Sequence, residues 1–288
     1  MVHLLFSLLS YLIYHLSEKN AYHLADFTAF VLQKIIRYRT GIVKENLSHC
    51  FPSLDDTEIA EISTRYYQHL ADLFIESFRV GRLHSGNIDE KYGQTGVPAM
   101  KEKLAAGQSV IFATAHFGNW EWGAAGCPYH LRPYPCVVFY KPIKNKKIES
   151  RIIARRESQG CEIISIAHTA ATFEKYKDRP TVYFMLADQS PSNLSKSLWV
   201  DFFNRPTAAL HGVEHYARCY GLAVFFGAVF QKENRGIYHI AITKITDNGT
   251  KNAPGEITQN FFYKLEEAIR IQPHNWLWTH KRWKHNPM

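Results

Sequence analysis

The sequence predicts an α/β protein in which a central, mostly parallel or mixed sheet is flanked by helices. Short runs rich in β-branched and aromatic residues alternate with helical patterns over most of the chain, and this alternation is typical of such a sheet. The length of 288 residues suits one core of that size rather than two full domains. With 46% hydrophobic and 21% charged residues, the composition is that of a packed protein, not of a disordered or fibrous one.

Six runs are expected to form strands, and helical patterns lie between most of them. The predicted strands are residues 110–115, 136–140, 161–165, 181–187, 222–230 and 238–245. The predicted helices are residues 120–125, 146–158, 167–176, 208–220 and 256–271. The very apolar run 222–230 is expected to be sheet core rather than a groove for a ligand.

Two helical regions precede the sheet. Residues 55–80 carry acidic side chains in the first turn and repeat apolar residues every three or four positions, which predicts a long helix. A glycine-containing loop at 81–96 then leads into the sheet. We expect an N-terminal helical region over residues 1–40 and one α/β domain over residues 41–288, with the long helix as part of that domain.

The N-terminal region has the character of a membrane anchor. Residues 4–16 are mainly apolar but shorter than the roughly 20 residues that a single span needs. They lack the basic leader and cleavage site of a secretory signal, so we expect no export. Residues 21–36 are amphipathic, with Leu24, Phe27, Val31 and Ile35 at helical spacing, and Lys34, Arg37 and Arg39 could meet anionic headgroups. The alternative is that both segments are buried core helices.

Charge and cysteine content limit the possible partners. Lys plus Arg number 34 against 26 for Asp plus Glu, and the net charge of +8 favours phospholipid headgroups, phosphorylated sugars or nucleic acid. No nucleic-acid motif is visible, so we expect no nucleic-acid partner, although a non-catalytic binding protein is an alternative. The five cysteines form no CxxC pair, which predicts neither a disulfide framework nor a zinc site and is typical of the cytosol.

The residues best suited to catalysis follow the first predicted strand. The run 109–115 ends at His116, and ligands bind at the carboxyl ends of strands in open α/β sheets. Asn119 is suited to cap the next helix. On a continuous helix His116 and Glu121 would lie about 140° apart, so we expect Gly118 to supply a bend that lets Glu121 accept a proton from the imidazole. The other nitrogen would then act as a general base on a hydroxyl that attacks an acyl carbonyl, without a covalent enzyme intermediate.

Other chemistries lack their motifs. The sequence contains no HExxH metal site, no GxSxG serine elbow and no GxxxxGK[ST] phosphate loop. We therefore expect neither a metal ion nor a cofactor. A histidine followed by a glutamate is still a weak signal in a chain with 15 histidines, and its context has to support it.

That context is an ordered set of motifs from about residue 38 to residue 284. They are Tyr38-Arg39, Asn46-Leu47, Phe51-Pro52, HFGNWE at 116–121, Asp188-Gln189 and WLWTHKRWK at 276–284. In this set the sequence resembles the lipid A biosynthesis (late) acyltransferases of the lysophospholipid acyltransferase group. The resemblance places His116 and Glu121 on the family's catalytic pair.

The resemblance implies an activity and a location. A fatty acyl chain would pass from a thioester, on acyl carrier protein or CoA, to a hydroxyl of a phosphorylated lipid A precursor at the cytoplasmic face of the inner membrane. Other acceptors remain open, namely a phosphoinositol mannoside, an aminoacyl lipid or a lysophospholipid. A hydrolase that only cleaves the thioester is a further alternative.

Further candidates would bind substrate. A basic segment that starts near Lys141 contains Arg156, which begins an Arg-x-x-x-Gly element like that of the family, with Arg155 as the neighbouring alternative. The resemblance marks Asp188 as an active-site carboxylate, and we expect it to orient Arg156 or the acceptor sugar. Asn119, in the catalytic motif, and Arg282, in the closing motif, complete the predicted substrate-binding set. The structural alternatives are a solvated helix face for the basic segment and simple turn chemistry for Asp188.

Overall fold

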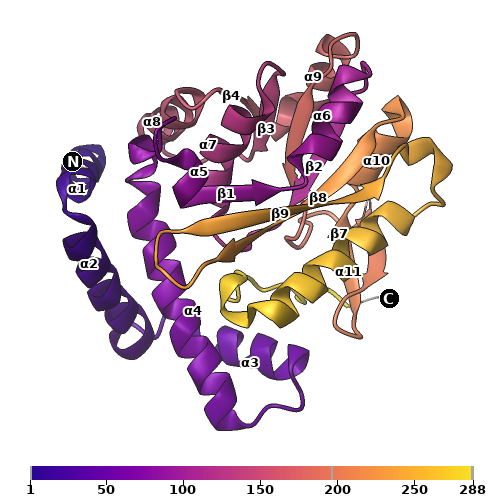
Figure 1. The fold of residues 1–288 in the computed structure, drawn as a ribbon. Helices are drawn as coiled ribbons and strands as arrows, with labels where there is room; N and C mark the ends of the chain where they lie inside the picture. The colour runs from indigo at the N-terminus through magenta and orange to yellow at the C-terminus, as the bar shows by residue number, and fades with distance from the viewer. Residues whose placement is uncertain (1, 196, 287–288) are drawn as a thin grey trace.

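The computed structural model describes residues 2–195 and 197–286, and these residues form a central seven-stranded sheet (Figure 1). Its strand order is β1-β9-β8-β2-β5-β3-β4. The strands are β1 (Tyr92–Thr95), β2 (Val110–Thr114), β3 (Cys136–Tyr140), β4 (Cys161–Ser165), β5 (Val182–Leu186), β8 (Ala223–Gln231) and β9 (Tyr238–Thr246). All six predicted strands are present, each within about one residue of its expected ends.

The sheet is mixed and mostly parallel, as predicted. Strands β2, β3, β4, β5 and β8 run in one direction. Strand β9 is antiparallel to β8, and β1 pairs parallel with β9, so these two strands run the opposite way. The sequence did not predict β1, because its four residues (YGQT) carry neither a polar–apolar alternation nor an apolar run.

Helices cover both faces of the sheet, which explains why its strands read as continuous apolar runs. In β2, Val110 and Phe112 join the core shared with α6 and α7, whereas Ile111 and Ala113 join the core shared with α9, α10 and α11. The helices are α1 (Val2–His15), α2 (Glu18–Phe30), α3 (Thr40–Cys50), α4 (Asp56–Ser77), α5 (Ile88–Lys91), α6 (Val97–Ala105), α7 (Trp120–Leu131), α8 (Lys146–Glu157), α9 (Thr169–Lys175), α10 (Gly212–Tyr220) and α11 (Glu256–Ile271).

The long helix predicted over 55–80 is α4, which runs down one side of the sheet with α2 along its outer side (Figure 1). A capping box starts it, since the Asp55 carboxylate accepts from the backbone N–H of Glu58 and the Glu58 carboxylate accepts from that of Asp55. On α2 the buried residues are Ala21, Ala25 and Ala29. Small side chains at this spacing let α2 approach α4 closely.

The apolar side chains predicted to share one face of the second N-terminal helix do not form the face that this helix buries. Phe27 is 63% exposed and Ile35, in the π-helical turn Val31–Ile35 that follows α2, is 64% exposed. Other large apolar side chains of this region that stay exposed are Leu8, Leu9, Tyr11, Leu12, Phe30, Ile36 and Tyr38. Among the described residues, no helix combines the length and the apolar character needed to cross a bilayer.

Two predicted helices differ from the structure in their extent. Residues 208–210 were expected in a helix, but they belong to β7 (Pro206–Leu210), which forms an antiparallel hairpin with β6 (Ser197–Asp201) before α10 begins at Gly212. Helix α7 continues to Leu131 rather than ending at 125, with Pro128 inside it.

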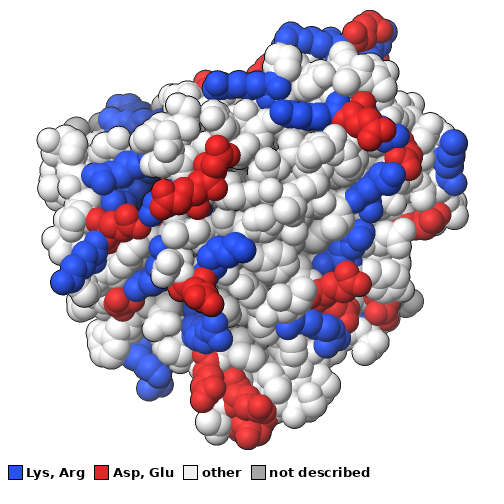
Figure 2. All heavy atoms as spheres, in the orientation of Figure 1, with Lys and Arg blue, Asp and Glu red and all other residues white. Residues whose placement is uncertain are grey.

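On the face drawn in Figure 2, basic and acidic side chains are interspersed rather than gathered into one basic patch.

The connection between β2 and α7 carries the HFGNWE motif, and Gly118 supplies the bend predicted there. Its φ of +61° lies in the left-handed region that favours glycine. A Cβ atom at this position would lie 1.8 Å from the backbone oxygen of Val229 in β8. The loop therefore rests directly on the backbone of the sheet.

Gly118→Ala should destabilise the fold by at least about 3 kcal/mol, because backbone strain and a backbone clash add together. Gly107→Ala is the matched control, since Gly107 also has positive φ (+83°) but no atom within 4 Å of its Cβ position. It should cost only about 1–2 kcal/mol. Urea unfolding measures both values, and equal losses for the two variants would contradict the close approach at Gly118.

Candidate active site

The loop that carries His116 is held by the C-terminal segment of the chain. The backbone N–H of Gly118 donates to the Asn275 carbonyl at 2.9 Å, and the N–H of Leu277 donates to the His116 carbonyl at 3.1 Å. Phe117 and Trp276 form an isolated antiparallel bridge between these two contacts. The closing tryptophan-rich motif is thus a backbone support for the loop that carries His116.

The carboxylate partner of His116 is Asp188, not Glu121. Asp188 follows β5, the neighbour of β2 in the sheet, and its Oδ1 lies 2.7 Å from His116 Nδ1. Its second oxygen accepts from the indole N–H of Trp276 at 3.0 Å. The side chain of Asp188 is almost wholly buried, whereas His116 keeps 18% of its side chain exposed. The amide nitrogen of Gln189 lies 3.3 Å from the other imidazole nitrogen, Nε2.

Glu121 instead holds Arg156. The Arg156 Nη2 lies 2.6 Å from Glu121 Oε1, and its Nε lies 3.2 Å from Oε2, which makes a two-point contact between a guanidinium and a carboxylate. Glu121 stands in the first turn of α7 and Arg156 in the last turn of α8. The predicted roles of the two carboxylates are therefore exchanged: Asp188 orients the imidazole and Glu121 orients the arginine.

The electrostatics of the His116–Asp188 pair favour a charged imidazole. Burial alone lowers the pKa of His116, but the charge of Asp188, its hydrogen bond and the charge of Glu121 outweigh burial and raise the pKa above its ordinary 6.5. For Asp188, burial alone would raise the pKa, but the charge of His116 and the hydrogen bonds with His116 and Trp276 lower it below its ordinary 3.8. Because Asp188 accepts at Nδ1, the neutral imidazole carries its hydrogen there and presents the Nε2 lone pair.

His116 lies at the wall of a cavity of about 650 Å³ that has a polar part and an apolar part. The polar side chains around it include His116, Glu121, Lys141, Arg156, Gln189, His280 and Lys284. The apolar part extends along the sheet and is lined by Phe112, Val138, Phe184, Val229, Ile240 and the ring of Tyr92. A cavity of this kind suits a ligand with a charged end and a long apolar chain.

A family model described as "Bacterial lipid A biosynthesis acyltransferase" matches residues 2–285 of the chain. The chain belongs to this acyltransferase family. The lipid A biosynthesis palmitoleoyltransferase of Escherichia coli (strain K12) is 21% identical over 256 residues, which cover 88% of this chain and 81% of that protein. The lipid A biosynthesis acyltransferase of Shigella flexneri matches with the same identity and coverage.

Apart from Asp188, which pairs with His116, the predicted substrate-binding residues of this acyltransferase fall into two groups. Lys141 and Arg156 line the cavity. Asn119 is fully buried and caps α7 by accepting from the Trp122 N–H, as expected of a cap, while Arg155 turns toward α4 and donates to the Ser77 carbonyl. Arg282 is 1% exposed and stacks over Phe262. These last three residues are not among the described residues that line the cavity.

Several contacts of the candidate site were not assigned a role from sequence. Gln189, His280 and Trp276 were visible only as members of motifs, and their positions beside His116 or Asp188 depend on the folded chain. His280 accepts from the backbone N–H of Ser190, and burial is the main cause that lowers its pKa to about 4. Tyr92 gave no signal, because it lies in the unpredicted strand β1.

The described residues contain no cluster of three or more His, Cys, Asp or Glu side chains that could hold a metal ion. Cys50, Cys127, Cys136 and Cys161 are buried thiols, and Cys219 is an exposed one. Burial raises the pKa of Cys161 to about 12, so this thiol stays protonated near neutral pH.

NMR titration of the His116 ring should give a pKa above 6.5, since the negative charge of Asp188 stabilises the imidazolium. Asp188→Asn removes that charge and should lower the value. Glu121→Gln should lower it less, because Glu121 contributes charge without bonding to the ring. A His116 pKa that Glu121→Gln shifts more than Asp188→Asn does would show that the carboxylates act as the sequence alone suggested.

Proposed function

We propose that this protein transfers a fatty acyl chain from a thioester, carried by acyl carrier protein or CoA, to a hydroxyl group of a phosphorylated lipid A precursor. The observation that carries the proposal is the His116–Asp188 pair at the wall of a cavity with an apolar part and cationic side chains. Family membership supports the reaction class, and the chemistry of the cavity supports the two substrates.

In the proposed mechanism, Nε2 of neutral His116 removes the proton of the acceptor hydroxyl while Asp188 stabilises the imidazolium that forms. The oxygen attacks the thioester carbonyl, the C–S bond breaks, and the imidazolium returns the proton to the leaving thiolate. The products are an ester and a free thiol, and no acyl-enzyme forms.

Arg156 is proposed to position an anionic group of the substrates. Its Nε and Nη2 are directed at Glu121, and no hydrogen bond among the described residues uses its Nη1. Lys141 and Lys284 lie around the same cavity. These cations can pair with phosphate groups of the acceptor or with acidic groups of the donor.

The fatty chain is proposed to lie in the apolar part of the cavity, with Tyr92 at its wall. The Tyr92 hydroxyl is buried and has no hydrogen-bond partner among the described residues. A Cβ atom on Gly123 of α7 would lie 2.9 Å from this hydroxyl. The space for the chain is therefore sensitive to both residues.

The N-terminal region is proposed to lie on the cytoplasmic face of the inner membrane. The exposed apolar side chains of α1, α2 and the following turn could enter the acyl–headgroup boundary, and Lys34, Arg37 and Arg39 could meet anionic headgroups. This placement would bring a membrane-bound acceptor to the enzyme without a transmembrane span.

His116→Ala should lower the turnover of acyl transfer by roughly 10² to 10⁴ through loss of the general base. The assay uses purified protein with defined acyl carrier protein and CoA thioesters, a lipid A precursor and other lyso-lipid acceptors, and mass spectrometry of the products. His168→Ala, at an exposed position outside the cavity, is the control. An unchanged rate in His116→Ala removes this residue from the mechanism, and thioester hydrolysis as the sole product counts against transfer.

Gly123→Ala should shift donor preference toward shorter acyl chains, because its methyl group pushes the Tyr92 hydroxyl into the apolar part of the cavity. Tyr92→Leu should shift it toward longer ones. Competition between thioesters of graded chain length measures both shifts, with Tyr183→Phe as a buried-tyrosine control away from this cavity. Equal chain-length profiles for all variants would place the fatty chain elsewhere.

A further inference from the structure

Glu76 is a buried carboxylate on which three parts of the fold converge. It lies one residue before the end of α4 and is only 2% exposed. Its carboxylate accepts from the hydroxyl of Tyr22 in α2 at 2.7 Å, from the hydroxyl of Tyr238 in β9 at 2.7 Å, and from the Asn119 side chain at 2.6 Å. Three donors on one buried carboxylate satisfy most of its acceptor capacity.

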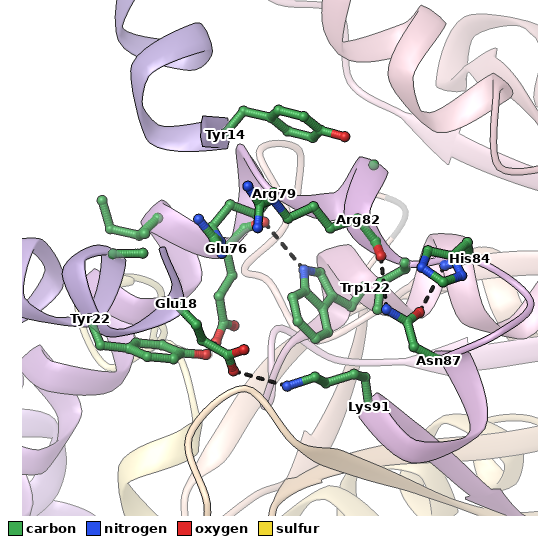
Figure 3. Close-up of a pocket in the computed structure, with 14 residues that line it drawn as sticks. Tyr14, Glu18, Tyr22, Glu76, Arg79, Arg82, His84, Asn87, Lys91 and Trp122 are labelled. Carbon is green, nitrogen blue, oxygen red and sulfur yellow. Dashed lines mark hydrogen bonds and ion pairs between the residues drawn. The ribbon is translucent and has the colours of Figure 1, made fainter. Parts of the chain in front are cut away.

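Two contacts join Glu76 to the start of α7. The carboxylate holds the Nδ2 of Asn119, the capping residue, and the backbone carbonyl accepts from the Trp122 indole at 3.2 Å. Figure 3 shows this indole directed at Glu76 and the Tyr22 ring beside the carboxylate, at a second cavity of about 470 Å³. In the sequence, Glu121 lies between Asn119 and Trp122, the two residues that Glu76 holds.

We propose that Glu76 is a positioning residue of the active site, which fixes the first turn of α7 and thereby the Glu121–Arg156 pair. Asn119 uses its oxygen to cap the helix and its nitrogen to bind Glu76, so the helix end cannot rotate without breaking one of these bonds. Through Tyr22, the position of Glu121 also depends on the docking of α2. The activity readout for this role rests on the proposed function.

Asp72 provides a matched comparison. It lies one turn earlier in α4 and is as buried as Glu76, but it pairs with Arg235 in the turn between β8 and β9. Loss of its charge removes a neighbour of Glu76 and Tyr22 on the same helix but removes no hydrogen bond of Asn119 or Trp122. A purely structural effect should therefore be similar in Asp72→Asn and Glu76→Gln, whereas a positioning effect should appear only in the latter.

The test that does not depend on activity is NMR of the Arg156 Nε–H group in the full-length protein, assigned with Arg156→Lys. Because this N–H donates to Glu121, it should exchange slowly in the wild type. Glu76→Gln removes the negative charge and leaves one acceptor oxygen for the three donors, which weakens the charge-assisted hydrogen bond from Asn119, so exchange should become about tenfold faster or more. Asp72→Asn should leave the rate within about twofold.

The activity arm is a double-mutant cycle. Glu76→Gln should lower kcat by about 10- to 100-fold, as misplacement near 1 Å does, and should cause little further loss in a Glu121→Gln background. Asp72→Asn should leave kcat nearly unchanged. If Glu76→Gln does not fold, Asn119→Ser replaces it, because serine retains the cap but cannot reach Glu76.

The role of Glu76 would be overturned if a folded Glu76→Gln or Asn119→Ser variant kept the wild-type exchange rate of the Arg156 Nε–H group. It would also be overturned if the losses of kcat in Glu76→Gln and Glu121→Gln multiplied fully in the double variant. Absence of acyl transfer by the wild type with every acceptor would instead overturn the proposed function, and the exchange measurement would still decide the role of Glu76.

Discussion

The geometry of the site depends on one buried interaction, the hydrogen-bonded pair of His116 and Asp188. It joins the ends of β2 and β5, and Trp276 brings in the C-terminal segment through the second oxygen of the same carboxylate. Removing an aspartate from water is costly unless its oxygens are paired. Asp188 meets this condition only when all three segments are in place, so the imidazole of His116 is oriented by the completed fold rather than by its own loop.

Two carboxylates lie near His116, and the structure gives each a different cation. Asp188 binds the imidazole of His116, whereas Glu121 binds the guanidinium of Arg156 in a two-point contact. Each carboxylate therefore has its own basic partner, and the two acidic side chains do not compete for one. The arginine is thereby placed beside the cavity with a fixed orientation, and His116 lines the same cavity.

Much of this fold could be predicted from local pattern. The strands 136–140 and 161–165 and the helix 256–271 match their patterns residue for residue, because a buried apolar run or a helical repeat is a local signal. The hairpin of β6 and β7 was missed, since residues 208–210 sit next to a helical pattern and their strand partner lies across a turn. The pairing of His116 with Asp188 was missed for a related reason: it follows from the adjacency of β2 and β5, which no spacing along the chain records.

In helix α2, the residues that are buried against the protein are small, and large apolar residues lie on the surface. Helix α2 buries a stripe of alanines against α4 and leaves Phe27 and Phe30 exposed, so its tight packing uses its smallest side chains. The same helix places the hydroxyl of Tyr22 on Glu76, whose other partners include the cap of α7. Only three side chains, those of Glu76, Asn119 and Glu121, therefore connect Tyr22 of α2 to Arg156. Any change that moves α2 on α4 must either break this buried hydrogen-bonded group or move the start of α7 with it.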